Sequence, residues 1–365
     1  MHLQTIRVHL GQRGYPIKIG SGVIASVGQE LNGLNGTGVV AVITVEGIRR
    51  LYGTAVEGSI AGSGIRPVVI EVPDREGAKT IQTYAEVMGE LLAARAGKDA
   101  LIVSLGGGCV GDLAGFVAAT YMRGVRLVHL PTTLLAQVDS SIGGKAALNL
   151  PGGKNSIGAF WQPCLVLSDV DVLKTLPQRE VGCGLAELIK YGAIMDIRLF
   201  EFIEREKGRL KALEREATLR AISAAARLKA KLVSVDEREA KGLRTLLNFG
   251  HTVGHAIEAA MEYRGYSHGE AISVGMVAES RLARLLGLCS DDEAERLERI
   301  IESYGLPTRL EGVPKEAIVD LMWHDKKVEG GRLKFALPNG LGRGIVVADP
   351  PTETVAKALE GVVGD

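Results

Sequence analysis

The segment ALIVSLGGGCVGD, residues 100–112, joins an apolar run to a glycine cluster and decides the expected fold. The apolar run, interrupted by one serine, is typical of a β-strand covered on both faces. Gly106, Gly108 and Gly111 then match the pattern G-x-G-x-x-G where a helical stretch begins. Glycines let backbone N–H groups approach a pyrophosphate, and a helix N-terminus favours negative charge. The segment therefore predicts a nucleotide-binding loop, with a tight structural turn as the alternative.

The regions around this segment repeat the alternation of strand and helix. Apolar runs at 39–44, 67–72 and 126–130 predict three further buried strands. Residues 80–96 place apolar side chains at helical spacing between two of these strands. Such alternation indicates an α/β domain with a parallel sheet, whose ligands bind at the carboxyl ends of the strands.

The sequence pattern changes near residue 180 and becomes mainly helical. Helical periodicity covers 185–194, 198–206, 210–235, 253–261, 269–286 and 291–304. Strand patterns return only at 332–337 and 344–347. We therefore expect a Rossmann-like α/β nucleotide-binding domain over residues 1–178. A mainly α-helical domain that binds metal and substrate is expected over residues 179–365.

Charge and composition exclude several classes of protein. The 43 basic and 43 acidic side chains cancel, which argues against a protein that binds nucleic acid or a membrane surface. The longest charge-free run, residues 31–45, is too short for a membrane span and contains glycines. The four cysteines form no CxxC pair, so reduced thiols and a cytoplasmic location are expected.

Two GGK sequences, at 143–145 and 152–154, lie nine residues apart. Neither fits the P-loop pattern, because Asp139 stands where its first glycine would be. A flexible backbone beside an ammonium group still suits a phosphate or carboxylate. A surface hairpin with solvated lysines is the alternative.

Histidines and one glutamate predict a metal site. His251 and His255 lie four residues apart and so share one helix face, but the zincin pattern H-E-x-x-H is not met. His251 and His268 could supply two ligands of a catalytic zinc, and Glu187, a lone acid among apolar residues, could supply a third. In the alternative, Glu187 and Lys190 form a surface pair and His255 belongs to the core.

Together these motifs resemble those of the 3-dehydroquinate synthases, within the sugar phosphate cyclase family. The resemblance runs over nearly the whole chain and rests on ordered motifs at residues 73–79, 106–112, 119–124, 131–141, 152–155, 173–177, 184–187, 248–256, 268–271 and 325–327. It implies the fold of these enzymes, a homodimer, and the cofactors NAD+ and Zn2+ or Co2+.

The implied reaction belongs to the shikimate pathway of aromatic amino acid and chorismate biosynthesis. A phosphorus–oxygen lyase converts 3-deoxy-D-arabino-heptulosonate 7-phosphate into 3-dehydroquinate and phosphate. By resemblance, NAD+ transiently oxidises a ring hydroxyl, phosphate is eliminated, and the ketone is reduced again. The ring then opens and an intramolecular aldol step closes a carbocycle.

The resemblance also implies roles for individual residues. The metal ligands are Glu187, His251 and His268. The implied NAD+ contacts are Asp74, Glu76 and Lys79 at the ribose, Gly107, Gly108, Cys109, Val110, Gly111 and Asp112 at the pyrophosphate, and Thr132, Thr133, Lys145, Lys154, Val172, Leu173, Lys174 and Thr175 in the rest of the pocket.

The implied substrate contacts fall into two groups. The substrate phosphate is assigned to Lys145, Asn155, His255 and Arg123, the last reaching across the dimer interface. The hydroxyls and carboxylate of the sugar acid are assigned to Asp139, Lys190, Lys229, Glu239, Arg244, Asn248 and Lys326.

Three other functions compete with this interpretation. Another sugar phosphate cyclase, such as a 2-deoxy-scyllo-inosose or valiolone synthase, would differ in its substrate pocket. Arg244 favours a substrate with a carboxylate, because its planar fork can bind one through two hydrogen bonds. A glycerol dehydrogenase-like oxidoreductase would not need the phosphate-directed cations Arg123 and Lys145. A nucleotide-sensing regulator would not need the glutamate and histidine set.

Overall fold

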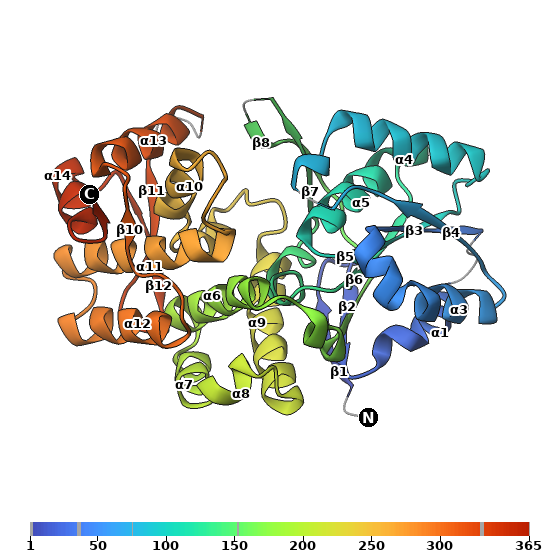
Figure 1. Ribbon diagram of the computed structural model, residues 1–365, viewed down its shortest axis with the longest axis horizontal. Coiled ribbons are helices and arrows are strands. Elements are labelled where there is room, and N and C mark those ends of the chain that lie inside the picture. Colours follow the sequence, from blue (N-terminus) through green and yellow to red (C-terminus); the bar gives the residue numbers. More distant parts are fainter. Residues whose placement is uncertain (1–2, 35–37, 75, 152, 329–331, 365) are drawn as a thin grey trace. The chain divides into compact units, whose positions relative to one another are not determined.

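The computed structural model describes residues 3–34, 38–74, 76–151, 153–328 and 332–364, with the side chains of 324–328 excepted. The chain forms two compact units (Figure 1). The first comprises Met1–Leu176 and Lys229–Arg238, and the second comprises Pro177–Leu228 and Glu239–Asp365. The first unit thus ends at Leu176 and also includes residues 229–238, and the predicted division of functions at residue 178 stays a prediction.

The first unit is built on a seven-stranded sheet. Its strand order is β1-β2-β9-β6-β5-β3-β4, and only the β1–β2 pair is antiparallel. The strands are β1 Gln4–Val8, β2 Tyr15–Gly20, β3 Val39–Thr44, β4 Arg66–Glu71, β5 Leu101–Gly106, β6 Arg126–Pro131 and β9 Leu165–Asp169. The predictions of β3, β4, β5 and β6 are confirmed, and β3, β5 and β6 are almost entirely buried, as their continuous apolar runs indicate.

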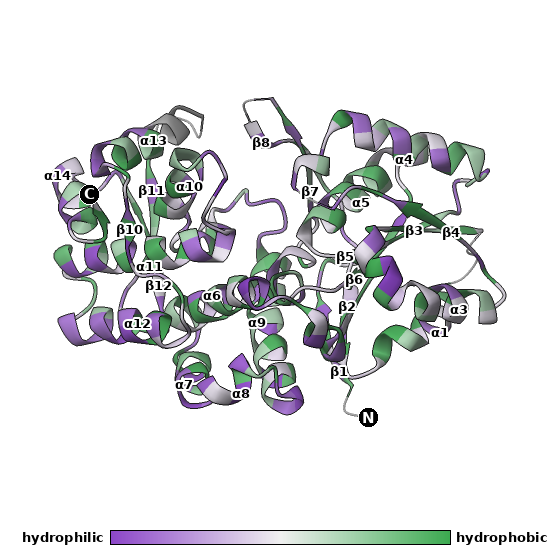
Figure 2. Ribbon diagram, in the orientation of Figure 1, coloured by the Kyte–Doolittle hydropathy of each residue, from purple (hydrophilic) through white to green (hydrophobic). Residues whose placement is uncertain are grey.

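Helices flank the sheet of the first unit (Figure 1). They are α1 Val27–Asn32, α2 Glu46–Ile48, α3 Thr54–Gly62, α4 Ile81–Ala93 and α5 Gly108–Thr120. A core that contains Ile43, Val87 and Leu113 joins the sheet to α4 and α5. Figure 2 shows β3 in the hydrophobic colour, as expected for a strand covered on both faces.

An antiparallel hairpin connects the two GGK sequences. Strand β7 (Lys145–Leu150) starts at the first GGK, and β8 (Gly153–Phe160) starts at the second. The two sequences thus belong to one hairpin, and the binding of an anion by its lysines stays a prediction. Gly115 of α5 lets β7 approach closely, because a Cβ on Gly115 would lie 2.8 Å from Cβ of Ala146. The hairpin thus packs against the helix that follows the glycine loop.

The second unit is mainly helical, as predicted. Its helices are α6 Gln178–Met195, α7 Ile197–Arg205, α8 Lys207–Lys211, α9 Arg215–Val235, α10 His251–Ala260, α11 His268–Leu285, α12 Asp291–Ser303, α13 Lys315–Val328 and α14 Thr352–Leu359, the end of α9 belonging to the first unit. Two short strand pairs complete it: β10 Leu310–Glu311 with β13 Val363–Gly364, and β11 Lys334–Pro338 with β12 Gly344–Ala348. Within the described ranges, no helix combines the length and the apolar character needed to cross a bilayer.

A buried histidine in the sheet predicts a pH-dependent stability. His129 of β6 lies beside Ser104 of β5, with Nδ1 and Oγ 2.6 Å apart, and burial lowers its pKa from 6.5 to about 4. Between these values the unfolded chain takes up a proton that the folded chain does not, so stability falls as the pH falls. We expect the contribution of His129 to the free energy of unfolding to be roughly 2 kcal/mol larger at about pH 7 than at about pH 5.

Urea unfolding at both pH values tests this expectation. His129→Gln keeps a polar partner for Ser104 without a titrating imidazole, and it should lose this part of the pH dependence. Equal slopes of stability against pH in the two proteins would contradict the assignment.

Candidate functional site

The glycine loop lies where β5 ends and α5 begins. Side chains on Gly106, Gly107 and Gly108 would meet Val110, Thr133 and Ser140 at 2.8, 3.0 and 3.2 Å. The N–H of Thr132 donates to the carbonyl of Gly106, and the buried Oγ1 of Thr132 has no hydrogen-bond partner among the described residues. A bare backbone at a helix N-terminus beside an unsatisfied hydroxyl fits a bound pyrophosphate.

Lys79 gathers three other predicted residues around one ammonium group. Its Nζ lies 2.7 Å from Oδ2 of Asp112, 2.6 Å from Oδ1 of Asn155 and 3.0 Å from Oε1 of Glu76. Burial lowers the pKa of Lys79, but the two carboxylates outweigh that effect and raise it. Lys79 therefore stays charged, and it connects the glycine-loop helix to the β7–β8 hairpin.

An open pocket of about 450 Å³ in the first unit collects five predicted residues. They are Asp112, Asp139, Lys145, Asn155 and Lys229. The buried ammonium of Lys229 donates to the backbone carbonyl of Asp139 at 2.7 Å and pairs with its Oδ1 at 2.8 Å. The pocket thus offers cations and a carboxylate to a polar, anionic ligand.

The other residues predicted in the first unit lie elsewhere on it. Val110, Val172 and Leu173 are buried, Cys109 and Gly111 are partly buried, and Asp74, Arg123, Lys154, Lys174 and Thr175 are exposed. Among the described residues, neither Arg123 nor Lys154 lines the 450 Å³ pocket. Their predicted contacts with ligand stay predictions.

The predicted metal ligands come together within the second unit. Glu187 lies on α6, His251 is the first residue of α10, and His268 is the first residue of α11. Oε1 of Glu187 lies 3.5 Å from Nε2 of His251 and 3.4 Å from Nε2 of His268. Two imidazoles and a carboxylate form a donor set typical of catalytic zinc, so these residues fit a bound divalent metal.

Hydrogen bonds orient both imidazoles toward Glu187. Nδ1 of His251 lies 3.0 Å from the carbonyl oxygen of Phe249, which can only accept, so Nδ1 carries the proton and Nε2 has a free lone pair. Nδ1 of His268 lies 3.5 Å from Oε1 of Glu258. A carboxylate behind a histidine ligand fixes the ring orientation and raises its basicity.

Sequence reasoning missed Glu258. It lies seven residues after His251 on the same face of α10, and it is a lone acid among alanines and isoleucine. An isolated acid in an apolar helix, the pattern that pointed to Glu187, could therefore have pointed to Glu258 as well.

The electrostatics of the two histidines differ. Burial, with a contribution from Lys190, lowers the pKa of His251 far below its usual value. Burial also lowers the pKa of His268, but hydrogen bonds to Glu187 and Glu258 outweigh it and raise the pKa to about 9. The carboxylates therefore favour a positive charge at this point, which a divalent cation also supplies.

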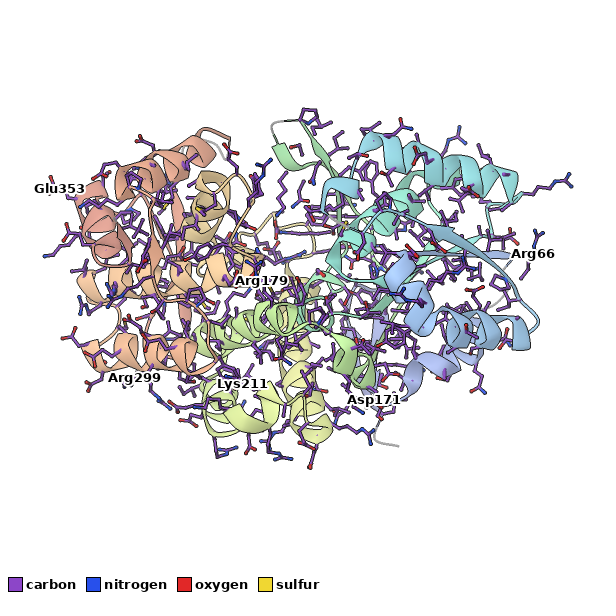
Figure 3. The ribbon with its side chains drawn as sticks, viewed as in Figure 1. Arg66, Asp171, Arg179, Lys211, Arg299 and Glu353 are labelled. Atoms are coloured by element: carbon purple, nitrogen blue, oxygen red, sulfur yellow. The ribbon has the colours of Figure 1, made fainter. Side chains whose placement is uncertain are left out.

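The first turn of α11, which carries His268, is fixed by a capping box and an ion pair. Oε2 of Glu270 accepts from the N–H of Ser267 at 2.6 Å and from Nη2 of Arg179, on α6, at 2.6 Å. Arg179 is labelled in Figure 3. A Cβ on Gly269 would lie 2.3 Å from Cα of Cys183, which is buried.

Glycines bring α10 and α11 into backbone contact. A Cβ on Gly275 would lie 2.0 Å from the carbonyl oxygen of Gly250, and one on Gly254 would lie 2.6 Å from Cδ1 of Ile272. Gly250 itself has φ +79°, which favours glycine. Backbone contact therefore sets the spacing of the two helices that present His251 and His268.

The burial of Lys190 and the exposure of His255 decide between the alternatives that the sequence left open for these residues. Lys190 pairs with Glu187 as the spacing predicts, but both side chains are 1% exposed, so the surface-pair alternative is wrong. His255 is exposed, so the core alternative is wrong too. Its ring centroid lies 5.3 Å from that of His251.

The remaining predicted residues of the second unit lie near its 3-10 segment Leu243–Asn248. Arg244 is 1% exposed, and its Nε lies 3.4 Å from Oε1 of Glu239. Asn248 is exposed. The side chain of Lys326 lies outside the described residues.

Comparison with known proteins extends over almost the whole chain. Residues 69–183 match the family model for the 3-dehydroquinate synthase N-terminal region, and residues 184–328 match that for its C-terminal region. The 3-dehydroquinate synthase of Pelotomaculum thermopropionicum is 48% identical over 345 residues, with 94% of this chain and 93% of that protein covered. That of Thermodesulfovibrio yellowstonii is 40% identical, with 98% and 99% covered.

Solved structures of sugar phosphate cyclases share the fold. A 2-epi-5-epi-valiolone synthase from Streptomyces hygroscopicus subsp. jinggangensis 5008, with NAD+ and Zn2+ bound, is 26% identical with a TM-score of 0.88, covering 95% of this chain and 96% of that one. A 2-deoxy-scyllo-inosose synthase complexed with carbaglucose-6-phosphate, NAD+ and Co2+ is 25% identical with a TM-score of 0.89, covering 98% and 100%. Because both family models match and relatives of this name are up to 48% identical over almost the whole chain, the chain belongs to the 3-dehydroquinate synthase family.

Proposed function

We propose that this protein converts 3-deoxy-D-arabino-heptulosonate 7-phosphate into 3-dehydroquinate and phosphate, as a phosphorus–oxygen lyase of the shikimate pathway. Its cofactors are NAD+ and Zn2+ or Co2+. The observation that carries the proposal is the convergence of Glu187, His251 and His268 in a chain 48% identical to a 3-dehydroquinate synthase.

The metal-binding residues would hold the metal ion, and their neighbours would orient them. Glu187, His251 and His268 would hold Zn2+ or Co2+, which supplies a Lewis acid for a substrate oxygen when bound. Phe249 keeps the proton on Nδ1 of His251, so that Nε2 stays available to a metal. Lys190 neutralises part of the charge of Glu187 inside the second unit.

The nucleotide-binding residues belong to the first unit. Bound NAD+ supplies a transient acceptor for hydride. The N–H groups at the start of α5 would bind its pyrophosphate, and Oγ1 of Thr132 would gain the partner that it lacks. Glu76, held by Lys79, would offer carboxylate oxygens to ribose hydroxyls, together with Asp74.

Each unit carries residues that we propose to bind substrate. Lys145 and Asn155, which line the 450 Å³ pocket, would bind the substrate phosphate, as would His255. Asp139, held by Lys229, would accept a hydrogen bond from a sugar hydroxyl. Arg244 would bind the carboxylate, which favours a sugar acid over glucose 6-phosphate.

The domain roles and the assembly are part of the same proposal. Residues 1–178 would bind NAD+, and residues 179–365 would bind metal and most of the sugar acid. The protein would act as a homodimer in the cytoplasm, with Arg123 reaching the partner's phosphate site. None of the four cysteines forms a disulfide in the described structure, which is consistent with a reducing compartment.

A direct assay tests the activity. Purified protein with NAD+, Zn2+ and the heptulosonate phosphate should release phosphate and form 3-dehydroquinate without net accumulation of NADH. Accumulating NADH would instead indicate an oxidoreductase. Turnover of glucose 6-phosphate without turnover of the heptulosonate would indicate another cyclase.

A further inference from the structure

Glu279 is a fully buried carboxylate that none of the predicted roles uses. It lies on α11, opposite the first turn of α10, and its side chain is 0% exposed. Its Oε2 accepts from the N–H of Gly250 at 2.6 Å, and its Oε1 accepts from the N–H of Val253 at 3.1 Å. The N–H of Thr252 also bonds to this carboxyl group, and burial outweighs these hydrogen bonds and raises its pKa to about 8. Glu279 therefore satisfies the backbone donors at the start of the helix that carries His251.

One peptide group joins Glu279 to His251. The N–H of Gly250 and the carbonyl of Phe249 belong to the same peptide bond. Glu279 accepts from that N–H, while Nδ1 of His251 donates to that carbonyl. Because hydrogen bonds in a chain polarise one another, an acceptor at the N–H of Gly250 makes the carbonyl of the same peptide a stronger acceptor for the imidazole proton.

Glu279 and Glu258 therefore have comparable places behind the two histidines. Glu258 faces Nδ1 of His268 directly, at 3.5 Å. Glu279 reaches Nδ1 of His251 through the intervening peptide. Carboxylates behind histidine ligands orient the ring and increase its affinity for a metal.

We infer that Glu279 is a positioning residue for the metal centre, acting on His251 through the Phe249–Gly250 peptide. The inference rests on the proposed metal-binding role of His251. On this inference, replacing Glu279 weakens metal binding and changes the coordination geometry, beyond any loss of stability of α10. The Gly250 conformation at φ +79° supports this, because it aims the peptide N–H at Glu279.

Two variants of Glu279 and one matched control test the inference. Glu279→Ala removes both acceptors, and Glu279→Gln keeps the shape and one acceptor. Glu293→Gln is the control. Glu293 lies on α12, which carries no predicted site residue, and accepts from the N–H groups of Ser290 and Leu341. Each full-length protein is stripped of metal, and the dissociation constant for Zn2+ is measured by competition with a chelator. The visible absorption spectrum of the Co2+ form then reports the coordination geometry.

We expect Kd for Zn2+ to rise by about 10- to 100-fold in Glu279→Ala, and by a smaller factor in Glu279→Gln. The Co2+ spectrum should change in both variants, while Glu293→Gln keeps the wild-type Kd and spectrum even if its melting temperature falls. If Glu279→Ala does not fold, Glu279→Gln decides. Wild-type Kd and an unchanged spectrum in a folded Glu279 variant would overturn the inference.

The proposed function fails differently. A wild-type protein that binds the metal but does not turn over the heptulosonate phosphate would contradict the function. The relay through the peptide would then still be supported by the binding and spectroscopic results, because neither measurement needs the substrate.

Discussion

Replacing Glu187 with glutamine is expected to lower kcat by roughly a thousandfold or more, because the change removes an anionic ligand from the metal centre. It also leaves the buried ammonium of Lys190 without its carboxylate, which destabilises the second unit. Metal content after dialysis should fall together with activity. Both can be measured on the same sample, by elemental analysis and by phosphate release.

A second variant and a control separate chemistry from stability. His251→Ala removes a ligand but keeps the Glu187–Lys190 pair, and it should lose activity to a similar degree. Glu298→Gln removes a carboxylate from a part-buried ion pair with Arg281 in the same unit, and it should keep metal and activity. Normal turnover in both Glu187→Gln and His251→Ala would contradict the metal assignment.

The other large effect is expected from Gly275→Ala. The new Cβ would lie 2.0 Å from the carbonyl oxygen of Gly250 and 2.9 Å from the backbone nitrogen of Gly254. Backbone atoms cannot rotate away, so α10 and α11 must separate. We expect the free energy of unfolding to fall by about 3 kcal/mol or more, and metal affinity to fall with it. Urea unfolding of the variant measures the first effect.

Gly89→Ala is the matched control for this substitution. Gly89 lies at an exposed position within α4, and nothing lies within 4 Å of a Cβ placed there. Alanine loses less backbone entropy than glycine when a helix forms, so this variant should gain about 0.5–1 kcal/mol. A Gly275→Ala protein as stable as wild type would show that the helices tolerate a wider spacing.

In the first unit, the sequence predicted the strands with long apolar runs, β3 to β6, and missed β1, β2 and β9. Residues 39–43 are all apolar, as a strand covered on both faces requires, and residues 126–130 depart from this pattern at Arg126 and His129. β1 and β2 instead alternate buried and less buried residues, and β9 has only three apolar residues in succession. Short or alternating runs do not distinguish a strand from a loop without knowledge of the neighbours that cover them.

The candidate site was predictable in its ligands but not in the groups that support them. Glu187 and His268 stand out as a lone acid in an apolar helix and as a member of a recognisable motif. Glu279 lies between an alanine and a serine, close to Arg281, which is typical of an exposed helix face. It is buried where α11 packs against the start of α10, and that packing depends on contacts between residues far apart in the sequence.

The backbone contact between α10 and α11 affects which amino-acid substitutions this protein can accept during evolution. At Gly275, the spacing between the helices is set by contact with a main-chain oxygen, an atom that every residue carries. Substitutions elsewhere in the second unit that keep this glycine and Glu279 therefore leave that contact in place. The geometry of the metal centre should therefore tolerate substitutions in the surrounding core, but not at the few glycines that let the two helices touch.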